Sequence, residues 1–388
     1  MVSKSNNLET YFIMLFQDTT CVQAVHTAFK ALAHQALWFH PADFHVAVAY
    51  TVGLIVHPDK RALFSVISHT TGVHVSALSD FLNPAVLGWP SDVLFNTLIQ
   101  SLPEGGELIT DLFVIPKDHT HCMEARKMWS SGHKRFVDGQ AYALLLWTKA
   151  QQAVVIGCRL LGEHDKRFDV TLEMIRYALA RGLQVKTLLA DGDYCRVPLI
   201  KALRQLQLFL VSKVRRDTWW YVGTDEVQLN VWAQTLAIET CHYYPGFGYA
   251  KGIEIACHGC APCKLVVLRP KRSSPVKDWY FLLSSDVTLS VPGVLRAKCR
   301  RWRIEVVIRD SSQQLGLKQH QGQLKTSERH VLMSFLAYNF LSGIKAQYGR
   351  TIGYWRKAWA KLYSQERTRV SAKLLLAEPC PPCFRPSS

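Results

Sequence analysis

Three acidic residues stand where the chain could bring carboxylates together. Asp111 lies within an apolar stretch, Asp191 ends another and precedes Gly192, and Glu305 lies in a segment crowded with arginines. Functional residues gather at strand ends in open mixed sheets, and carboxylate oxygens are ligands that Mg²⁺ prefers. Two such ions stabilise the attacking and leaving oxygens of an in-line phosphoryl displacement. Brought together from distant stretches, the three acids could therefore hold two Mg²⁺ ions for phosphoryl transfer.

Each acid also has a purely structural interpretation. Asp111 could be a solvated strand residue. Asp191 could cap the helix that follows it, a role for which Asp193 competes. Glu305 could pair with Arg301, one helical turn earlier. Taken singly, none of these residues decides between the two interpretations.

The segments around the acids alternate between strand and helix patterns. Apolar runs predict strands at 107–116, 139–147, 153–161, 185–190 and 208–214, and helical periodicity predicts helices at 169–182, 197–206 and 330–344 and from Val291. Three strands followed by alternating helices and strands predict an α/β fold. Its mixed sheet would carry helices packed on its faces.

Changes in composition divide the chain into five parts. These are a helical domain (1–100), the first part of the α/β core (101–214), a β-rich insertion (215–285), the second part of the core with the Glu305 helix (286–345), and a basic segment with a disordered tail (346–388). Within the first part, residues 64–83 predict a helix, a Thr-Gly turn and a second helix. This pattern fits either a DNA-binding helix-turn-helix or an ordinary helical hairpin.

The charge of the chain points to a polyanionic partner. The formal net charge is +16, yet residues 1–100 carry −2, so the remainder carries +18. A basic surplus concentrated in one part of a chain suits nucleic acid. No apolar stretch reaches the length of a membrane span, and the N-terminus lacks the apolar core of a signal peptide. We therefore expect a cytoplasmic protein with no membrane partner.

The segments that contain the acids resemble one known family. "LLADGDYCRVPLIKALRQLQLFLVSKVRRD" around Asp191, "VLRAKCRRWRIEVVIRD" around Glu305 and "ITDLFVIPKD" around Asp111 are similar to the three acidic motifs of insertion-sequence DDE transposases. The similarity is to the cut-and-paste superfamily that has a Y-R-E-K signature and a β-strand insertion domain. It covers roughly residues 60–345, and the order of the motifs is more specific than any one of them.

This resemblance implies an RNase H-like mixed sheet with flanking helices, in which Asp111, Asp191 and Glu305 bind the metal ions. The implied chemistry is DNA hydrolysis at transposon ends, followed by strand transfer into target DNA. Expected partners are double-stranded DNA, as terminal repeats and as target, and further copies of the chain in a homodimer or higher multimer. The implied location is the nucleoid of a prokaryotic cytoplasm. The DNA contacts that we expect are Tyr194, Lys213, Arg215, Arg216, Lys298, Arg301 and Arg303.

The chain departs from the family pattern at three positions. Lys298 stands where the signature has its tyrosine, and Ser312 stands where it has its lysine. Leu112 follows Asp111 where many relatives have a second acid. An alternative function is therefore a decayed, catalytically inactive copy that acts only as a DNA-binding protein. A third is a nuclease without strand transfer, against which the long insertion argues.

The cysteines raise the question of a second metal. Cys257, Cys260 and Cys263 have a spacing that suits Zn²⁺, and Cys380 and Cys383 repeat it in the tail. An odd total of 11 cysteines without an export signal is more typical of free thiols. We therefore favour unliganded thiols over a zinc site at Cys257, Cys260 and Cys263.

Overall fold

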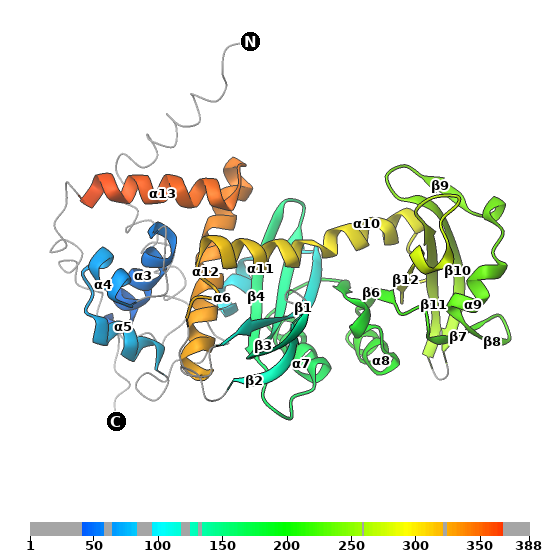
Figure 1. Cartoon of the computed structure of the whole chain (residues 1–388), viewed down its shortest axis with the longest axis horizontal. Helices are drawn as coiled ribbons and strands as arrows, with labels where there is room; N and C mark the ends of the chain where they lie inside the picture. The colour runs from blue at the N-terminus through cyan, green and yellow to red at the C-terminus, as the bar shows by residue number, and fades with distance from the viewer. Residues whose placement is uncertain are drawn as a thin grey trace, which may run out of the picture. The chain divides into compact units, whose positions relative to one another are not determined.

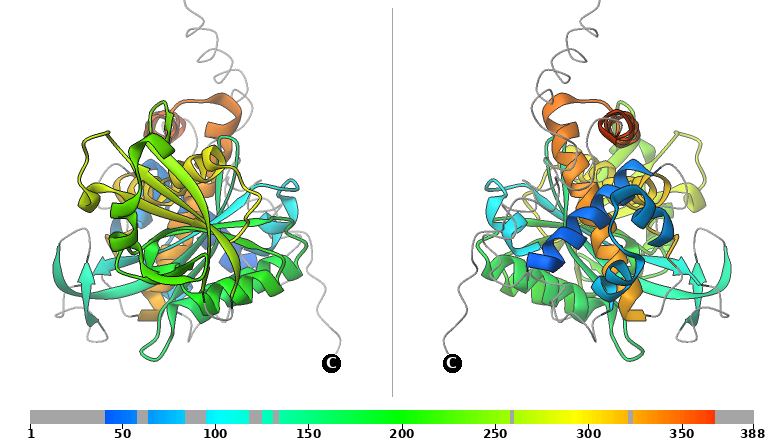
Figure 2. Two further views of the ribbon diagram at one scale, coloured as in Figure 1. Left: turned by 90° about the vertical axis from the view of Figure 1, so that its right-hand side faces the viewer. Right: turned by 90° about the vertical axis from the view of Figure 1, so that its left-hand side faces the viewer.

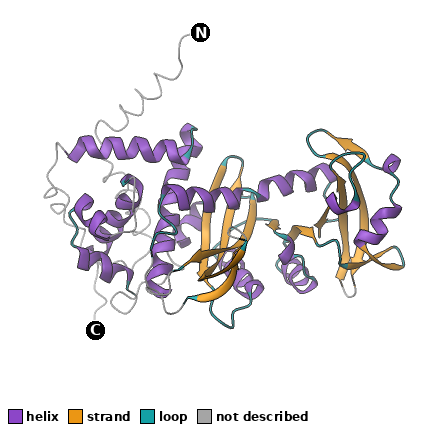
Figure 3. Ribbon diagram, in the orientation of Figure 1, coloured by secondary structure: helices purple, strands orange, loops and turns teal. Residues whose placement is uncertain are grey.

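The computed structural model describes residues 41–57, 64–83, 95–117, 125–130, 134–257, 260–320 and 324–367. The chain divides into two compact units, one made of 1–98, 114–140 and 308–388 and the other of 99–113 and 141–307. Most of the strands belong to the second unit (Figure 3). The disordered tail and the cysteine pair of the tail that the sequence suggests lie outside the described residues.

Helices make up most of the first unit. They are α3 (Pro41–Val56), α4 (Phe64–Thr71), α5 (Val75–Leu82), α12 (Leu324–Tyr348) and α13 (Ile352–Arg367), with α6 (Asn96–Ser101) starting in this unit. Helix α12 packs against α3, α5 and α13 (Figure 2, right). Helices α4 and α5 are joined by a turn in which Gly72 has φ +77°, a conformation that glycine adopts without strain. The helix, turn and helix predicted over 64–83 are confirmed.

A β-hairpin completes the first unit. Strand β2 (Arg126–Ser130) pairs antiparallel with the start of β3 (Arg135–Lys149), with Trp129 opposite Phe136. The sequence patterns did not predict β2. Gly139 of β3 lies against β1, because a Cβ there would stand 2.6 Å from the carbonyl oxygen of Ile115. Only glycine allows this close approach of two strands.

The second unit contains the centre of a mixed sheet (Figure 1). Its strands and helices are β1 (Glu107–Pro116), β4 (Gln152–Leu160), α7 (Arg167–Ala180), β5 (Thr187–Ala190), α8 (Val197–Gln205) and β6 (Phe209–Val214), with most of β3. Strands β1, β5 and β6 run parallel, whereas β3 and β4 are antiparallel. Buried aliphatic side chains of β5 and β6 form the core. The predicted α/β class and mixed sheet are confirmed.

Strands also fill most of the segment between β6 and the last helices of the second unit. They are β7 (Trp219–Val222), β8 (Asp225–Gln228), β9 (His242–Tyr244), β10 (Gly248–Cys257), β11 (Cys260–Arg269) and β12 (Tyr280–Ser284), with the short helix α9 (Leu229–Trp232). Strands β10, β11 and β12 lie side by side and antiparallel (Figure 2, left). Strand β12 pairs with β6, so the insertion continues the central sheet.

Two helices follow β12 where the sequence predicts one. Helix α10 (Val291–Arg301) begins at Ser290, whose hydroxyl accepts a hydrogen bond from the Gly293 amide. Helix α11 (Arg303–Gln314) continues after a break at Trp302. Among the described residues, no helix combines the length and the apolar character needed to cross a bilayer.

Candidate active site

The register of two parallel strands brings the first two acids together. Leu108 pairs with Leu188 and Ile109 with Leu189. Continued along both strands, the same register places Asp111 level with Asp191, which directly follows β5. Neighbouring strands lie about 4.8 Å apart. The two carboxylates therefore start from adjacent positions at one end of β5.

The Asp111 side chain is partly buried and has two polar partners. Its Oδ1 accepts a hydrogen bond of 2.8 Å from the Leu112 amide, and its Oδ2 lies 3.3 Å from Nη1 of Arg301. Burial raises the pKa of Asp111 to about 6, the nearby Asp191 and Glu305 charges also raise it, and the two partners lower it. Asp191 and Glu305 therefore lie near enough to Asp111 for their charges to disfavour its ionised form.

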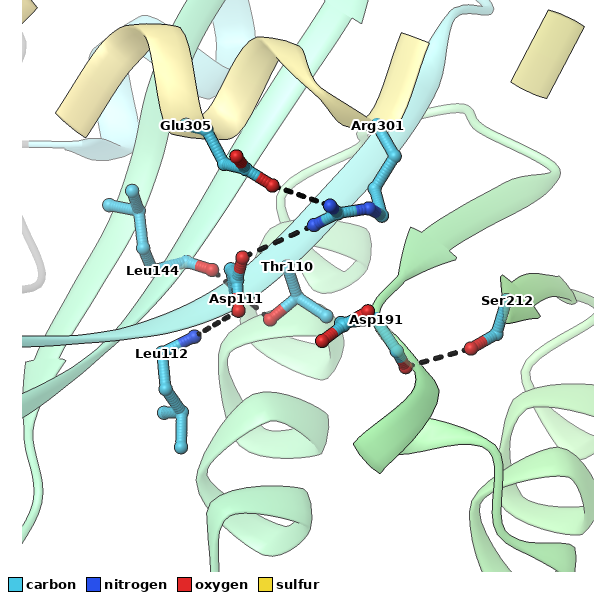
Figure 4. A network of polar contacts seen from close by, with 8 residues as sticks. All are labelled: Thr110, Asp111, Leu112, Leu144, Asp191, Ser212, Arg301 and Glu305. Atoms are coloured by element: carbon cyan, nitrogen blue, oxygen red, sulfur yellow. Dashed lines mark hydrogen bonds and ion pairs between the residues drawn. The ribbon is translucent and has the colours of Figure 1, made fainter. Parts of the chain in front are cut away.

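Leu112 points away from this environment (Figure 4). Successive side chains of a strand alternate between the two faces of the sheet, so residue 112 lies on the face opposite to Asp111. A second acid at position 112 would therefore not join Asp191 and Glu305. This placement supports Asp111 as the acid of the first motif.

Asp191 is not used as a helix cap. It precedes the short helix η2 (Gly192–Tyr194), but its side chain caps no amide there, and its backbone oxygen accepts a hydrogen bond of 2.7 Å from the Ser212 hydroxyl. The neighbouring acid Asp193 is instead paired with Arg167 at 2.9 Å. Among the described residues, the Asp191 carboxylate therefore neither caps a helix nor forms an ion pair.

Arg301 joins two of the acids. Its Nη2 lies 2.5 Å from Oε1 of Glu305, while its Nη1 reaches Asp111 (Figure 4). The pairing of Glu305 with Arg301 that the sequence suggests is therefore present, but the guanidinium also bridges from α10 to β1. Bidentate ion pairs from Arg300 to Glu107, at 2.5 and 2.6 Å, hold α10 on the same strand.

The carboxylates of Asp111, Asp191 and Glu305 are suitable ligands for hard divalent cations, since carboxylate oxygens are ligands of Mg²⁺ and Mn²⁺. In this structure, however, these three carboxylates are not arranged around a metal-sized site. Among the described residues, no group of three or more His, Cys, Asp or Glu side chains is arranged to hold a metal ion. The Arg301 guanidinium supplies the positive charge between Asp111 and Glu305. Metal binding would therefore require Arg301 to leave that position.

Two lysines share one tyrosine in the second unit. Nζ of Lys298 lies 3.9 Å from the ring centroid of Tyr280, and Nζ of Lys213 lies 5.9 Å from it. Burial lowers the pKa of Lys298, the Cys299 thiol raises it, and the Lys213 charge lowers it. The sequence did not single out Tyr280, because its partner on α10 lies 18 residues away. A paired cationic site of this kind suits a phosphate.

The other expected DNA contacts differ in their surroundings. Tyr194 is 1% exposed and packs edge-on against Phe168, so its hydroxyl does not reach a ligand at the surface. Arg303 donates a hydrogen bond to the Thr148 hydroxyl. In the loop after β6, Arg215 pairs with Asp217 at 2.8 Å, and Arg216 donates to the Lys277 carbonyl oxygen. These two arginines are exposed, whereas Tyr194 belongs to the core.

Ser312 makes a local bond at the signature position where lysine is expected. Its hydroxyl donates to the carbonyl oxygen of Ile308, 2.7 Å away and one turn earlier in α11. This is a common bond for serine inside a helix. The hydroxyl therefore has a structural partner of its own.

Arg204 of α8 lies against the two described thiols at the start of β11. Its Nη1 is 3.5 Å from Sγ of Cys260, and its Nη2 is 3.7 Å from Sγ of Cys263. Burial and the neighbouring Cys260 together raise the pKa of Cys263 to about 12. A guanidinium beside the two thiols does not resemble a zinc site, in which thiolates bind the metal.

Comparisons with known proteins bear on the family and the fold of this chain. Residues 152–340 match the family model of the transposase DDE domain, a range that includes Asp191 and Glu305. The fold is similar to that of the piggyBac transposase in its synaptic complex with hairpin DNA, with a TM-score of 0.52 and 10% sequence identity over 87% of this chain and 75% of that chain. No curated protein matches the sequence. The resemblance to DDE transposases is therefore confirmed, and the α/β fold is similar to that of a solved transposase structure.

Proposed function

We propose that this chain is a DNA transposase that cleaves DNA at transposon ends and transfers the strands into target DNA. The observation that supports this proposal most directly is the convergence of Asp111, Asp191 and Glu305, from β1, the end of β5 and α11. The last two of these acids lie in the segment that matches a transposase domain. The basic residues on neighbouring elements supply a surface for phosphates.

The acids would hold two Mg²⁺ or Mn²⁺ ions, which, when bound, stabilise charge on the attacking and leaving oxygens. In the cleavage step a water oxygen bonds to phosphorus as the bond to the 3′-oxygen breaks, leaving a 3′-hydroxyl. In the transfer step that hydroxyl attacks a target phosphodiester and displaces a 3′-oxygen. Arg301 would move from the acids to a DNA phosphate, and Lys298 with Lys213 would bind a second phosphate beside Tyr280.

The assembly that we propose follows from the same chemistry. Cutting and joining two transposon ends requires both ends in one complex, so we propose a homodimer or higher multimer on paired double-stranded ends. The structural neighbour was solved as a synaptic complex with hairpin DNA. The place of action that we propose is the nucleoid of a prokaryotic cytoplasm.

A second candidate function is DNA binding without catalysis. It is favoured by two observations: the described acids form no ready metal site, and Ser312 replaces the signature lysine. The two candidates differ in one measurable property, which is metal-dependent strand cleavage. Both predict binding to transposon ends.

The experiment that separates them is cleavage of DNA that carries the ends of the element encoding this chain. The full chain is incubated with Mg²⁺, with Mn²⁺ and with EDTA, and the products are resolved on sequencing gels. The transposase predicts cuts at the ends and joined products with either metal and none with EDTA. End binding without cuts under any condition would establish the inactive copy, and cuts without joined products would establish the nuclease.

A further inference from the structure

Two aromatic side chains of the β2–β3 hairpin face solvent together. Trp129 and Phe136 are cross-strand partners, so they share one face of the hairpin. Their ring centroids lie 5.5 Å apart, with the rings at 74°. Trp129 is 55% exposed and Phe136 is 61% exposed. In the described part of the chain, no other ring-contact pair is exposed to this degree on both sides.

The pair contributes little to the core of its own unit. More than half of each side chain is accessible, and β2 is the last strand in the order of the sheet, so the described residues place no further strand beside it. Exposed apolar surface of this kind marks an interaction site more often than a structural one. We therefore infer that Trp129 and Phe136 contact a binding partner.

The charge around the rings indicates which partner. Described residues 126–130 and 134–138 contain four basic side chains and one acid, Asp138. Lys127, Lys134 and Arg135 are exposed. Lys127 lies two residues before Trp129 and so on the same face as the rings. Cations beside an exposed aromatic surface are complementary to nucleic acid, which combines flat bases with phosphates.

The exposed rings favour bases that are not paired. Inside a duplex both faces of every base are covered by its neighbours, whereas an unpaired base offers a free face. Because the rings stand nearly perpendicular, a base stacked on one ring meets the edge of the other, an arrangement that aromatic groups favour. Lys127 can then bind a phosphate next to that base.

We propose that Trp129 and Phe136 form a stacking platform for unpaired DNA bases, with Lys127 binding an adjacent phosphate. The choice of DNA over RNA rests on the proposed function. The platform lies in the first unit, outside the segment that matches the transposase domain, and it uses none of the three acids.

The test measures binding of the full chain to a fluorescent oligothymidine and to a duplex of equal length, in EDTA so that no cleavage interferes. Trp129→Ala and Phe136→Ala should each weaken single-strand binding about tenfold, with less than a twofold change for duplex. Trp129→Phe should restore most of the affinity. Tyr243→Ala, which removes a similarly exposed aromatic from the insertion, is the matched control and should change neither affinity. Circular dichroism checks that each variant is folded.

The outcomes separate this inference from the proposed function. Unchanged single-strand affinity in Trp129→Ala would overturn the platform, even if the wild type cleaves DNA. A loss confined to Trp129 and Phe136 variants would support it, even if the wild type cleaves nothing. If those variants instead convert a dimer into a monomer with DNA affinity intact, the surface is a contact between copies and the platform is overturned.

Discussion

Arg301 lies between Asp111 and Glu305, with nitrogen-to-oxygen distances of 3.3 and 2.5 Å. All three side chains are partly shielded from solvent, so their charges are screened less than those at the surface. The guanidinium therefore offsets the repulsion between carboxylates that the proposed reaction needs close together. This relationship makes Arg301 and divalent cations competitors for the same acids.

The first prediction concerns this competition. In EDTA, Arg301→Ala should lower the free energy of unfolding by about 1–2 kcal/mol, between the values for exposed and buried ion pairs. Mg²⁺ should stabilise Arg301→Ala more than the wild type, because the variant leaves the acids without a cation. Urea unfolding with and without Mg²⁺ measures both effects. Arg215→Ala, which breaks an exposed pair, is the control. Equal responses of wild type and variant to Mg²⁺ would contradict the competition.

The second prediction concerns the pH dependence of stability. Burial raises the pKa of Asp111 from 3.8 to about 6. Between these values the folded state binds a proton that the unfolded state releases, so this group makes the protein less stable as pH rises. In EDTA the free energy of unfolding of the wild type, minus that of Asp111→Asn, should fall by up to about 3 kcal/mol between about pH 4 and pH 6. Subtraction removes the effect of other titrating groups. A flat difference would contradict a raised pKa of Asp111 in the folded state.

The third prediction concerns the lysine pair beside Tyr280. If Lys298 binds a phosphate, Lys298→Ala should weaken duplex binding and reduce the dependence of log affinity on log salt by about one unit. Fluorescence anisotropy across a salt series gives this slope. Lys271→Ala removes an exposed lysine of the insertion and serves as the matched control. A lower affinity with the same slope would mean that Lys298 supports the fold through Tyr280 and does not touch DNA.

The fourth prediction concerns a buried polar contact in the helical unit. His330 Nε2 lies 2.9 Å from the carbonyl oxygen of Gly316, which can only accept, so Nδ1 is the atom that accepts from the Tyr50 hydroxyl at 2.8 Å. Tyr50→Phe leaves this nitrogen unpaired and should cost about 1–2 kcal/mol of stability. Thermal and urea unfolding measure the loss, with the exposed Tyr243→Phe as control. A neutral Tyr50→Phe would mean that the hydrogen bond does not stabilise the fold.

The same histidine predicts acid sensitivity. Burial lowers the pKa of His330 from 6.5 to about 4, so the unfolded chain takes up a proton before the folded one does. Its contribution to stability is complete above about pH 6.5 and is lost as pH falls toward about 4. This direction is opposite to that of Asp111. The contributions of Asp111 and His330 to the pH dependence of stability can therefore be separated. The difference between wild type and Asp111→Asn contains only the contribution of Asp111.

Hydrophobic periodicity was enough to predict the strand that contains Asp111, the strand that precedes Asp191, and the helices between the strands. Strands β1, β5 and β6 and helices α7 and α8 bury continuous apolar runs or faces, and these leave a strong pattern in the sequence. Strand β2 was missed because its Trp129 is exposed and its other residues include two cations, so no buried alternation marks it. The break between α10 and α11 at Trp302 was missed because neither glycine nor proline stands there.

The sequence was enough to predict which acids form the candidate site, but not which side chains contact them. Asp111, Asp191 and Glu305 could be named from strand ends and from the family resemblance. The bridge by Arg301 and the Lys298–Tyr280 contact depend on how α10 packs against distant strands, and no local pattern records that packing. Packing also makes one prediction about the site doubtful. Tyr194 was expected to contact DNA, but it is buried beside Phe168.

The measurement that tests the central claim most directly is end cleavage by Asp111→Asn, Asp191→Asn and Glu305→Gln, each beside Asp193→Asn. Asp193 is the matched control because it lies two residues from Asp191 but pairs with Arg167. The account predicts that each of the first three variants loses at least about a hundredfold in cleavage rate with Mg²⁺ while binding ends as the wild type does, and that Asp193→Asn stays near the wild-type rate. Cleavage that survives in any of the three variants would contradict a site built from these carboxylates.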